Sequence, residues 1–331
     1  MTKIYFRLDI DKGIDHGIGH FVRSVQLYRK INKKNCIFLV NDPNFFIKLI
    51  KKNLIKPPKK IIKYDFNTFT ETYKTRNKNI FIFDTLGRDK NLKKYLKSVN
   101  DSNRIISLED KFLYNKYNDV IINSKVKLYN HKKKIKNVKI YSGIKYTILR
   151  FNKKNKYHKL VPKKKYKILV CSGGADYKKL LSKVSSMLAK FKNLKISCIV
   201  GPSVKKKDKI FKLSKIYSNL KLVINKFNLN NEFKKADLVI SSGGSMMIES
   251  IFFSKPTFVI ETFNHQKEII KYFNSEKLIF SLGNIKKLSK KRIESLILNI
   301  NKNLSHMNKM TKKSSKLIDN KGVERVLKVI F

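Results

Sequence analysis

The sequence predicts an α/β protein built from two Rossmann-like domains, each with a mainly parallel sheet. Its 331 residues are enough for two domains of about 150 residues, each with a proper core. Short apolar and β-branched runs alternate with longer segments of helical periodicity, which is typical of βαβ units. The same alternation restarts after a polar segment near the middle of the chain. We therefore expect a ligand-binding cleft between the two domains.

The first domain is expected to span residues 1–150. Its strands are predicted at six short apolar runs, with segments of helical periodicity among them. These runs are Ile4–Leu8, Cys36–Val40, Ile80–Phe83, Arg104–Ser107, Val120–Ile122 and Lys139–Tyr141. Residues 151–166 are polar and cationic and contain Pro162, so we expect an exposed linker there.

The second domain is expected to span residues 167–331. Its pattern predicts strands at Lys167–Cys171, Ile196–Val200, Lys221–Ile224, Leu238–Ile240, Thr257–Ile260 and Leu278–Phe280. The chain from about Leu288 onwards has helical periodicity and ends in the amphipathic segment Val323–Phe331. We assign this terminal helix to the second domain.

The charge pattern argues against a specific nucleic-acid-binding protein. The formal net charge is +53, and a basic surface of this kind attracts phosphate backbones. Only nine of the 76 basic residues are Arg, however, and the lysines are spread along the whole chain beside many Asn and Ile residues. A general drift towards Lys, Asn and Ile from an A/T-rich coding bias explains this distribution. Phosphorylated or polyanionic ligands would still be favoured electrostatically.

The cysteines and the apolar runs indicate the cellular compartment in which the protein is expected. Cys36, Cys171 and Cys198 lie in or beside apolar runs, far apart and without the spacing of metal ligands. Such residues are expected to be buried free thiols, which suits a reducing cytoplasm. No apolar stretch approaches the roughly 18 residues that a membrane span needs, so we expect a soluble cytoplasmic protein and no transmembrane segment.

Three glycine-containing turns follow predicted strands. Open α/β sheets bind ligands at the carboxyl ends of their strands, where glycine lets backbone N–H groups approach a phosphate at a helix N-terminus. None of the turns matches Gly-x-Gly-x-x-Gly or the Walker lysine loop, so a dinucleotide cofactor and P-loop chemistry are not predicted. The expected ligand contacts in these turns are Gly17 and Gly19; Ser172, Gly173, Gly174 and Asp176; and Ser242, Gly243, Gly244 and Ser245.

Two further groups of polar residues accompany the third turn. Glu249 follows Ser245 by four residues, so a helix that begins at the glycines would carry it one turn in. A carboxylate there can accept hydrogen bonds from ribose hydroxyls, although a solvated or dipole-favoured Glu in the first helical turn is the alternative. Asn264, His265 and Gln266 form a polar cluster at the carboxyl end of the predicted strand Thr257–Ile260.

The ordered series of motifs resembles the PseG-like UDP-sugar hydrolases of pseudaminic acid biosynthesis, within the GT-B group of nucleotide-sugar enzymes. The matching pieces run in order across most of the chain. They are Phe6-Arg7-Leu8-Asp9; Gly17-x-Gly19-His20-x-x-Arg23; Phe83-Asp84-Thr85-Leu86-Gly87; Ile106-Ser107-Leu108-Glu109-Asp110; Ser142-Gly143; Leu149-Arg150; Cys171-Ser172-Gly173-Gly174-Ala175-Asp176; Ile240-Ser241-Ser242-Gly243-Gly244-Ser245 with Glu249; and Asn264-His265-Gln266.

The resemblance implies an activity and a distribution of roles. Members of that family cleave a UDP-linked 2,4-diacetamido-2,4,6-trideoxyhexose to free sugar and UDP, hold UDP mainly in the C-terminal domain, and need no metal. His20 matches the family's catalytic histidine, and Gly243, Gly244, Ser245 and Glu249 match its nucleotide-contacting segment. The stretch between Asp9 and Gly17 is longer than the family loop and contains Asp11, Asp15 and His16, and Tyr28 replaces a small residue. The exact sugar therefore stays open.

Hydrolysis at an anomeric carbon needs a base for water, because UDP is already a good leaving group. His20 suits that role, since histidine exchanges a proton near neutral pH. Asp9 or Asp84 is expected to orient its imidazole, or else to cap a helix. Arg7, Arg23 or Arg150 is expected to balance charge on the pyrophosphate.

Two other functions remain open. A glycosyltransferase on the same fold would use His20 to activate a sugar or lipid hydroxyl in place of water. A non-catalytic polyanion-binding protein would use the lysine surface alone. For the enzyme we expect a UDP-sugar as the binding partner, no cofactor, no metal, and a monomer or weak dimer.

Overall fold

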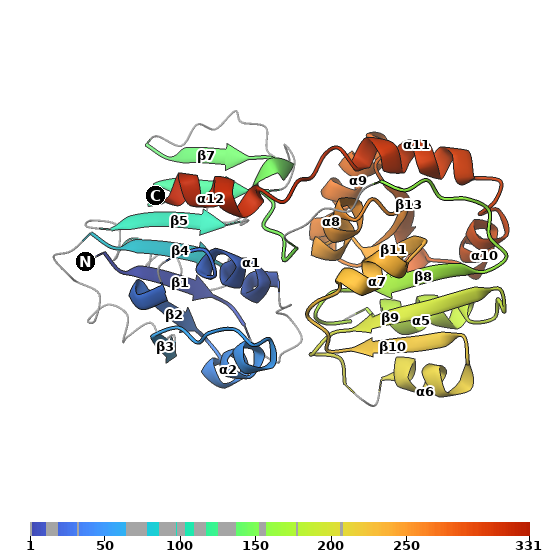
Figure 1. Cartoon of the computed structure of the whole chain (residues 1–331), viewed down its shortest axis with the longest axis horizontal. Coiled ribbons are helices and arrows are strands. Elements are labelled where there is room, and N and C mark those ends of the chain that lie inside the picture. Colours follow the sequence, from blue (N-terminus) through green and yellow to red (C-terminus); the bar gives the residue numbers. More distant parts are fainter. Residues whose placement is uncertain are drawn as a thin grey trace. The chain divides into compact units, whose positions relative to one another are not determined.

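A computed structural model of the chain shows two compact α/β units (Figure 1). Unit 1 comprises Met1–Arg150 and Lys321–Phe331, and unit 2 comprises Phe151–Asn320. Each unit contains one parallel sheet with helices, which confirms the predicted fold class. The structure describes residues 2–10, 19–31, 33–63, 78–85, 97, 103–108, 117–124, 137–151, 157–176, 178–205 and 208–331.

Unit 1 contains a seven-stranded parallel sheet with the order β3-β2-β1-β4-β5-β6-β7. Its strands are β1 (Ile4–Leu8), β2 (Cys36–Val40), β3 (Lys60–Lys63), β4 (Ile80–Asp84), β5 (Arg104–Leu108), β6 (Val120–Asn123) and β7 (Lys139–Ser142). The strand order reverses at β1, which pairs with β2 on one side and β4 on the other. The sequence does not predict β3, because this short edge strand has only two apolar residues, both half-buried.

Helices and aromatic side chains cover this sheet. The described helical segments of unit 1 are α1 (Gly19–Tyr28), η1 (Lys33–Asn35), α2 (Pro43–Lys52), η2 (Ile144–Tyr146) and α12 (Gly322–Ile330). Helix α2 begins with Pro at its first position, and the Asp42 side chain accepts a hydrogen bond from the Phe45 N–H at 2.9 Å. The ring of Phe38 lies 4.8 Å from Phe6 and 4.9 Å from Phe46, so β1, β2 and α2 share one core.

The terminal helix α12 belongs to unit 1, contrary to the assignment from sequence. It contacts η2, α1 and β6. Gly322 permits this packing, because a Cβ there would fall 1.9 Å from the carbonyl oxygen of Thr147. Arg104 also donates to the Val329 carbonyl at 2.9 Å. Periodicity showed that this helix has an apolar face, but it contains no information on which domain covers that face.

Unit 2 contains a six-stranded parallel sheet with the order β10-β9-β8-β11-β12-β13. Its strands are β8 (Tyr166–Cys171), β9 (Leu194–Val200), β10 (Leu220–Ile224), β11 (Leu238–Ser242), β12 (Thr257–Glu261) and β13 (Phe280–Asn284). Strand β13 begins where the predicted strand Leu278–Phe280 ends. Leu278 and Ile279 are buried but precede the pairing with β12, which starts at Phe280 opposite Phe258.

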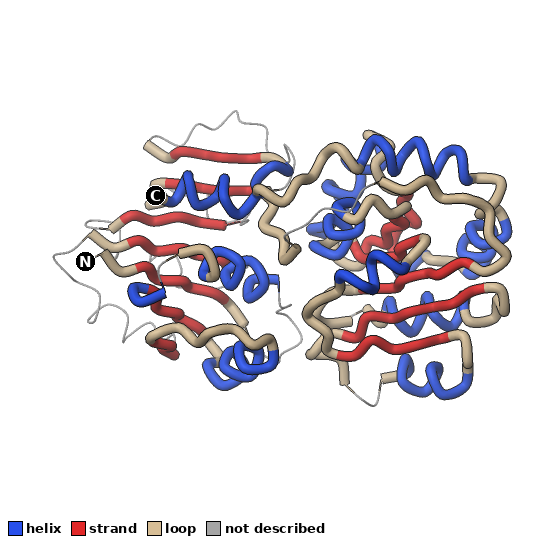
Figure 2. The backbone as a smooth tube through the Cα atoms, viewed as in Figure 1, coloured by secondary structure: helices blue, strands red, loops and turns tan. Residues whose placement is uncertain are grey.

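The helices of unit 2 pack on both sides of its sheet (Figure 2). They are α5 (Leu180–Leu188), α6 (Lys209–Ile216), α7 (Asn230–Lys235), α8 (Ser245–Phe252), η3 (Asn264–Gln266), α9 (Lys267–Ser275), η4 (Ile285–Lys287), α10 (Lys290–Leu298) and α11 (Leu304–Ser314). One continuous core joins α5, α6, α10 and α11 to the strands. All three cysteines are buried and free, as expected.

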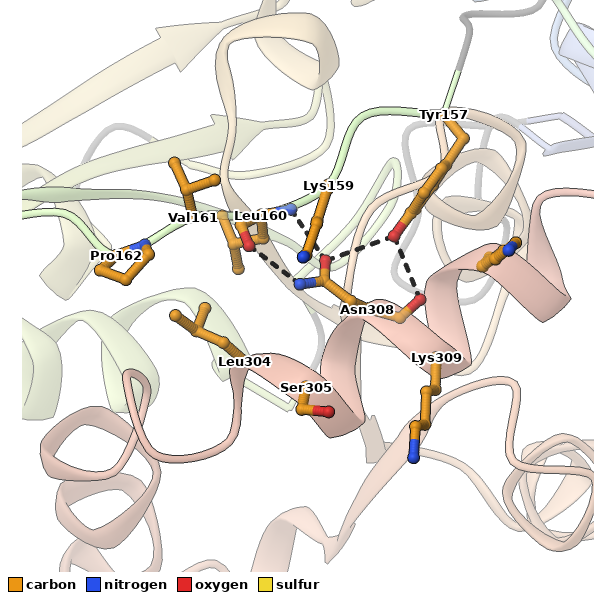
Figure 3. A pocket seen from close by; sticks show the side chains of 10 residues that line it. Tyr157, Lys159, Leu160, Val161, Pro162, Leu304, Ser305, Asn308 and Lys309 are labelled. Carbon is orange, nitrogen blue, oxygen red and sulfur yellow. Dashed lines mark hydrogen bonds between the residues drawn. The ribbon is translucent and has the colours of Figure 1, made fainter.

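Part of the predicted linker 151–166 is packed on unit 2. Phe151 and Leu160 are buried, and the side-chain amide of Asn308 on α11 makes two hydrogen bonds with the Leu160 backbone. The Tyr157 hydroxyl donates to the Asn308 carbonyl at 3.3 Å (Figure 3). Residues 157–163 therefore form a strap along α11, whereas Pro162 is exposed as expected. Within the described part of the chain, no helix is long and apolar enough to span a membrane.

Candidate functional site

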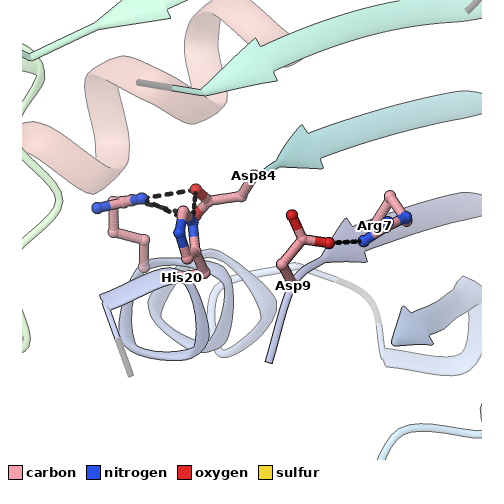
Figure 4. Close-up of polar contacts among 5 residues, drawn as sticks. Arg7, Asp9, His20 and Asp84 are labelled. Atoms are coloured by element: carbon pink, nitrogen blue, oxygen red, sulfur yellow. Dashed lines mark hydrogen bonds and ion pairs between the residues drawn. The ribbon is translucent and has the colours of Figure 1, made fainter. Parts of the chain in front are cut away.

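Two of the predicted catalytic residues meet at the carboxyl end of the unit 1 sheet. Asp84 is the last residue of β4, and His20 is the second residue of α1. His20 Nδ1 lies 2.6 Å from Asp84 Oδ1, and the two residues are 7 % and 0 % exposed (Figure 4). Strands β1 and β4 are neighbours at the point where the strand order reverses, which is where open α/β sheets bind ligands.

Arg23 joins this pair one helical turn after His20. Its Nε donates to Asp84 Oδ2 at 3.0 Å, and its second terminal nitrogen donates to Asp84 Oδ1 at 2.6 Å. Burial raises the pKa of Asp84, but the positive charge of Arg23, the interaction with His20 and their hydrogen bonds outweigh burial and lower it to about 2. Asp84 is therefore a carboxylate at neutral pH. His20, Arg23 and Asp84 together are called the unit 1 network below.

The charge on Asp84 assigns the proton on the imidazole. A carboxylate only accepts hydrogen bonds, so the 2.6 Å contact is satisfied when His20 Nδ1 carries the hydrogen. In the neutral form of the ring, Nε2 is then the lone-pair nitrogen, which is the arrangement that lets a histidine take a proton from a substrate or water. Arg23 also lies 3.1 Å from Nδ1, and it could donate there only if Nδ1 carried no hydrogen. That tautomer would leave two acceptors facing each other at 2.6 Å, so the Asp84 contact decides against it.

Arg7 and Asp9 form a separate pair on β1 and the residues after it. Arg7 donates to Asp9 Oδ1 at 2.5 Å, and both residues are at least nine-tenths buried (Figure 4). The structure thus resolves one alternative left open by the sequence, because Asp84 and not Asp9 contacts His20. Both Arg7 and Arg23 are engaged with carboxylates in the chain, and their contact with a pyrophosphate stays a prediction.

The glycine turns of unit 2 lie at the corresponding place in its sheet. Strands β8 and β11 are neighbours at the reversal of strand order, and the turns that begin at Ser172 and Ser242 follow them directly. The Ser242 hydroxyl donates to the Ser172 carbonyl at 3.0 Å, which ties the two turns together. Gly244 precedes the first residue of α8, so the third glycine turn leads directly into a helix N-terminus, where proteins commonly hold anions.

Two glycines at this end of the unit 2 sheet, Gly243 and Gly201, lie where other parts of the chain approach closely. A Cβ at Gly243 would fall 2.6 Å from Ile270 Cδ1 of α9, so that helix packs directly against the turn. A Cβ at Gly201 would fall 2.3 Å from the carbonyl oxygen of Gly174. Gly201 follows β9, and sequence reasoning missed it. The signal was present as the Gly201-Pro202 pair directly after a predicted strand.

Two buried hydroxyls near these turns lack partners. The side chain of Ser241, the fourth residue of β11, is fully buried, and the Ser203 hydroxyl follows β9. Neither oxygen has a hydrogen-bond partner among the described residues. Ser203 is held beside the Gly174 turn, because its N–H donates to the Gly174 carbonyl at 3.2 Å. Unpaired buried hydroxyls are uncommon in proteins, and they suit a ligand rich in oxygen.

Asp176 closes the second glycine turn. Its Oδ2 accepts a hydrogen bond from the Leu181 N–H at 3.0 Å, which satisfies one donor at the start of α5. Burial raises the pKa of Asp176 to about 6, although that hydrogen bond lowers it, and the charge of Asp208 adds to the increase. This carboxyl therefore exchanges its proton close to physiological pH.

Glu249 lies on α8, four residues after Ser245, as the sequence predicts. It is only 2 % exposed, so the alternative of a solvated glutamate does not hold. Its side chain is buried one turn from the glycines, and its contact with ribose hydroxyls stays a prediction.

The polar cluster after β12 has mixed roles. Gln266 is buried, and its Oε1 accepts hydrogen bonds from the Thr262 N–H and hydroxyl, both at 3.0 Å. This arrangement braces the turn. Asn264 and His265 are exposed, and the His265 ring stacks on Phe263 at 5.5 Å.

The remaining predicted residues are placed as follows. Gly19 begins α1, Gly173 has a positive φ of 105°, Ser245 is exposed, and Arg150 is half-buried at the end of unit 1. Gly17 and His16 lie outside the described residues. Among the residues that the structure describes, no group of three His, Cys, Asp or Glu side chains has the arrangement of a metal site.

Comparison with known proteins adds to this geometry. Residues 167–326 match the glycosyltransferase family 28 C-terminal domain. The solved structure of MurG from Acinetobacter baumannii is similar with a TM-score of 0.68 over 99 % of each chain, at 12 % identity. This chain has a GT-B fold. The same GT-B fold is shared with the UDP-GlcNAc 2-epimerase of Neisseria meningitidis, solved bound to UDP-GlcNAc, at a TM-score of 0.64, 11 % identity and 99 % coverage of both chains.

Two curated relatives align in sequence over most of this GT-B chain. An uncharacterized protein of Methanocaldococcus jannaschii is 29 % identical over 276 residues, which cover 78 % of this chain and 56 % of that protein. This chain thus spans little more than half the length of that relative. The spore coat polysaccharide biosynthesis protein SpsG of Bacillus subtilis is 25 % identical over 282 residues, or 82 % of each chain. These similarities support a glycosyltransferase-like family of nucleotide-sugar enzymes, without singling out the PseG-like hydrolases.

Proposed function

We propose that the chain is a UDP-sugar hydrolase that releases a diacetamido-trideoxyhexose and UDP in nonulosonic acid biosynthesis. The observation that carries this proposal is the His20–Asp84 contact of 2.6 Å at the switch point of a GT-B unit. The motif series of the PseG-like family supports the choice of sugar. The fold that the chain shares with a UDP-GlcNAc complex supports the choice of nucleotide.

The chemistry follows from the two sites. His20 Nε2 would remove a proton from water as its oxygen bonds to the anomeric carbon, while the bond from that carbon to the UDP oxygen breaks. The proton would stay on the imidazole, and ionised Asp84 stabilises the resulting cation through Nδ1. UDP leaves as an anion. In unit 2, the N–H groups at the start of α8 and the Ser203 and Ser241 hydroxyls would hold its oxygens.

A glycosyltransferase is the second candidate. The match of residues 167–326 to a glycosyltransferase C-terminal domain favours it, as does the spore coat polysaccharide relative. The same histidine would then deprotonate an acceptor hydroxyl in place of water. The donor site would be unchanged, so the two candidates differ in the acceptor alone.

One experiment separates these candidates. The protein is incubated with UDP-linked 2,4-diacetamido sugars in water enriched in ¹⁸O, with and without candidate acceptors, and the products are identified by mass spectrometry. A hydrolase releases UDP without an acceptor and places ¹⁸O in the anomeric hydroxyl of the free sugar. Release of UDP only when an acceptor is present would establish transfer, and a changed UDP-sugar without release of UDP would establish epimerisation. Both results would overturn the proposal.

A further inference from the structure

A second pocket in unit 2 lies at the opposite end of the sheet from the glycine turns. It is formed where strands begin: Lys167 is the second residue of β8, Asp237 precedes β11, and Pro256 precedes β12. Its volume of about 490 Å³ is within the range of small-molecule sites. Strand β8 has six residues, so the two ends of the sheet are about 17 Å apart. The pocket is therefore separate from the proposed nucleotide site.

Lysine dominates the lining of this pocket. Fourteen residues line it, and six of them are lysines: Lys159, Lys163, Lys167, Lys234, Lys235 and Lys255. Across the whole chain, lysine accounts for 67 of 331 residues. The fraction of lysine in the lining is thus about twice that of the chain, which the general composition does not explain. This site is called the lysine pocket below.

The positive charge of the lysine pocket is largely uncompensated. Asp237 is the one carboxylate among its described lining residues. One oxygen of Asp237 is 2.5 Å from Lys163 Nζ, and the other accepts a hydrogen bond from the Lys167 backbone N–H at 2.8 Å. The single acid is therefore already engaged with one lysine. Lys255 Nζ donates to the Lys234 carbonyl at 3.1 Å, a neutral acceptor.

Lys255 shows the effect of this crowding. Burial lowers the pKa of Lys255, the charge of Asp237 raises it, and the charge of Lys163 lowers it again. The net direction is downward. The charge of an anion bound in the pocket would act in the same direction as Asp237 and favour the protonated form of Lys255.

Ser254 supplies an observation independent of charge. It lines the lysine pocket, is 5 % exposed, and adopts a left-handed backbone conformation with φ of 54°. Its hydroxyl is buried without a hydrogen-bond partner among the described residues. A buried hydroxyl normally has a partner, and an acceptor on a ligand bound beside Ser254 would supply one.

We propose that the lysine pocket binds a small soluble anion that carries two or more phosphate groups. Phosphate oxygens accept hydrogen bonds both from ammonium groups and from a hydroxyl, which are the donors present. Lysine is a common phosphate ligand that acts as a point charge, and it imposes no bidentate geometry of the kind that arginine imposes. One phosphate would leave most of the six lysines uncompensated, and this favours a ligand with several charges.

Calorimetric titration with inorganic tripolyphosphate tests the proposal, at about 0.15 M salt and with UDP in excess to occupy the other site. A pocket pair, Lys234→Gln with Lys235→Gln, is compared with a control pair, Lys212→Gln with Lys215→Gln, which removes the same charge from the exposed side of α6. The pocket pair should weaken binding by about tenfold or more. The control pair should change it by less than about twofold.

A third variant leaves the charge unchanged. Ser254→Ala removes only the unpartnered hydroxyl, and it should weaken tripolyphosphate binding by about three- to tenfold. Equal losses in the two lysine pairs, with no effect of Ser254→Ala, would show diffuse attraction to the +53 surface and overturn the proposal. Orthophosphate that binds as tightly as tripolyphosphate would overturn the assigned ligand class. Because all these measurements concern the lysine pocket, failure of UDP to bind would leave their outcome interpretable.

Discussion

The two sheets of this protein reverse their strand order in the same way, yet their carboxyl ends are equipped differently. In unit 1 the acids and bases satisfy one another, through the unit 1 network and the Arg7–Asp9 pair. In unit 2 the corresponding place has glycine turns, unpaired hydroxyls and a single carboxyl on the second turn. Paired charges are thus the main feature of one end, and glycine turns are the main feature of the other.

Two carboxyls with opposite pKa shifts express this difference most clearly. The pKa of Asp84 is lowered to about 2 because Arg23 and His20 outweigh burial. The pKa of Asp176 is raised to about 6 because burial outweighs a hydrogen bond from the backbone. A fixed charge holds a histidine in one tautomer, whereas an anion-binding turn is helped by a carboxyl that can become neutral. Under the proposed function, the same topology would serve proton transfer in one unit and ligand binding in the other.

The largest expected effect comes from His20→Asn. Asparagine keeps a polar side chain but cannot take a proton at neutral pH, so the turnover of the UDP-sugar should fall by about 10²- to 10⁴-fold. The affinity for UDP should stay within about twofold, because the nucleotide is assigned to unit 2. Steady-state rates at saturating substrate and calorimetric UDP binding measure the two quantities. Near-normal turnover in a folded variant would show that another residue acts as the base, and His16 would be the next residue to test.

Asp176→Asn should raise stability in a pH-dependent way. The folded pKa of about 6 lies above the ordinary value of 3.8, so the stabilising contribution of this group is complete below pH 3.8 and is lost as pH rises to 6. Asparagine does not ionise and can still accept the Leu181 hydrogen bond. The variant should therefore exceed the original by up to about 3 kcal/mol above pH 6 and match it near pH 4. Urea unfolding at both pH values measures this.

Asp84→Asn provides the opposite case. Its folded pKa of about 2 lies below 3.8, so its contribution is present above pH 3.8 and is lost as pH falls to 2. The variant should lose about 2 kcal/mol of unfolding free energy at pH 7. If Asp84→Asn and Asp176→Asn shifted stability in the same direction at pH 7, the contrast between the two units would be wrong.

Glu249→Gln should act on the nucleotide. UDP in hundredfold excess over its dissociation constant is expected to stabilise the original protein by about 2.7 kcal/mol. Replacing the buried carboxylate removes charge-assisted bonds to ribose, so UDP should bind about 1–3 kcal/mol more weakly, with a smaller effect on the chemical step. Thermal shift and calorimetry measure both. An unchanged affinity for UDP would show that Glu249 does not contact the nucleotide.

Gly201→Ala tests how the turns of unit 2 are held. A Cβ at this position meets the Gly174 backbone at 2.3 Å, so one turn must move and stability should fall by about 1–3 kcal/mol. Gly244→Ala is the matched control, because the nearest atom to its Cβ is 4.0 Å away. Unfolding free energies of the two variants are compared. Equal values would show that the close approach at Gly201 has no energetic consequence.

The sequence predicts most of the strands and the two glycine turns of unit 2, because buried parallel strands are continuous apolar runs and glycines mark the turns after them. It also places His20 at the start of a helix. It cannot decide between Asp9 and Asp84 as the partner of His20, since both follow strands and only the order of strands in the sheet brings one of them close. The close approach at Gly201 cannot be predicted without knowing which turns are neighbours. That depends on the pairing of strands that are far apart in the sequence.

The return of α12 to unit 1 has a consequence for how the chain is made. Unit 2 is one continuous segment, Phe151–Asn320, and all of it leaves the ribosome before Lys321–Phe331. Unit 1 therefore has to wait, with the surface of η2 and β6 uncovered, until a whole second unit has been synthesised. During that interval unit 2 can already be native, so the half of the molecule encoded first is the half completed last.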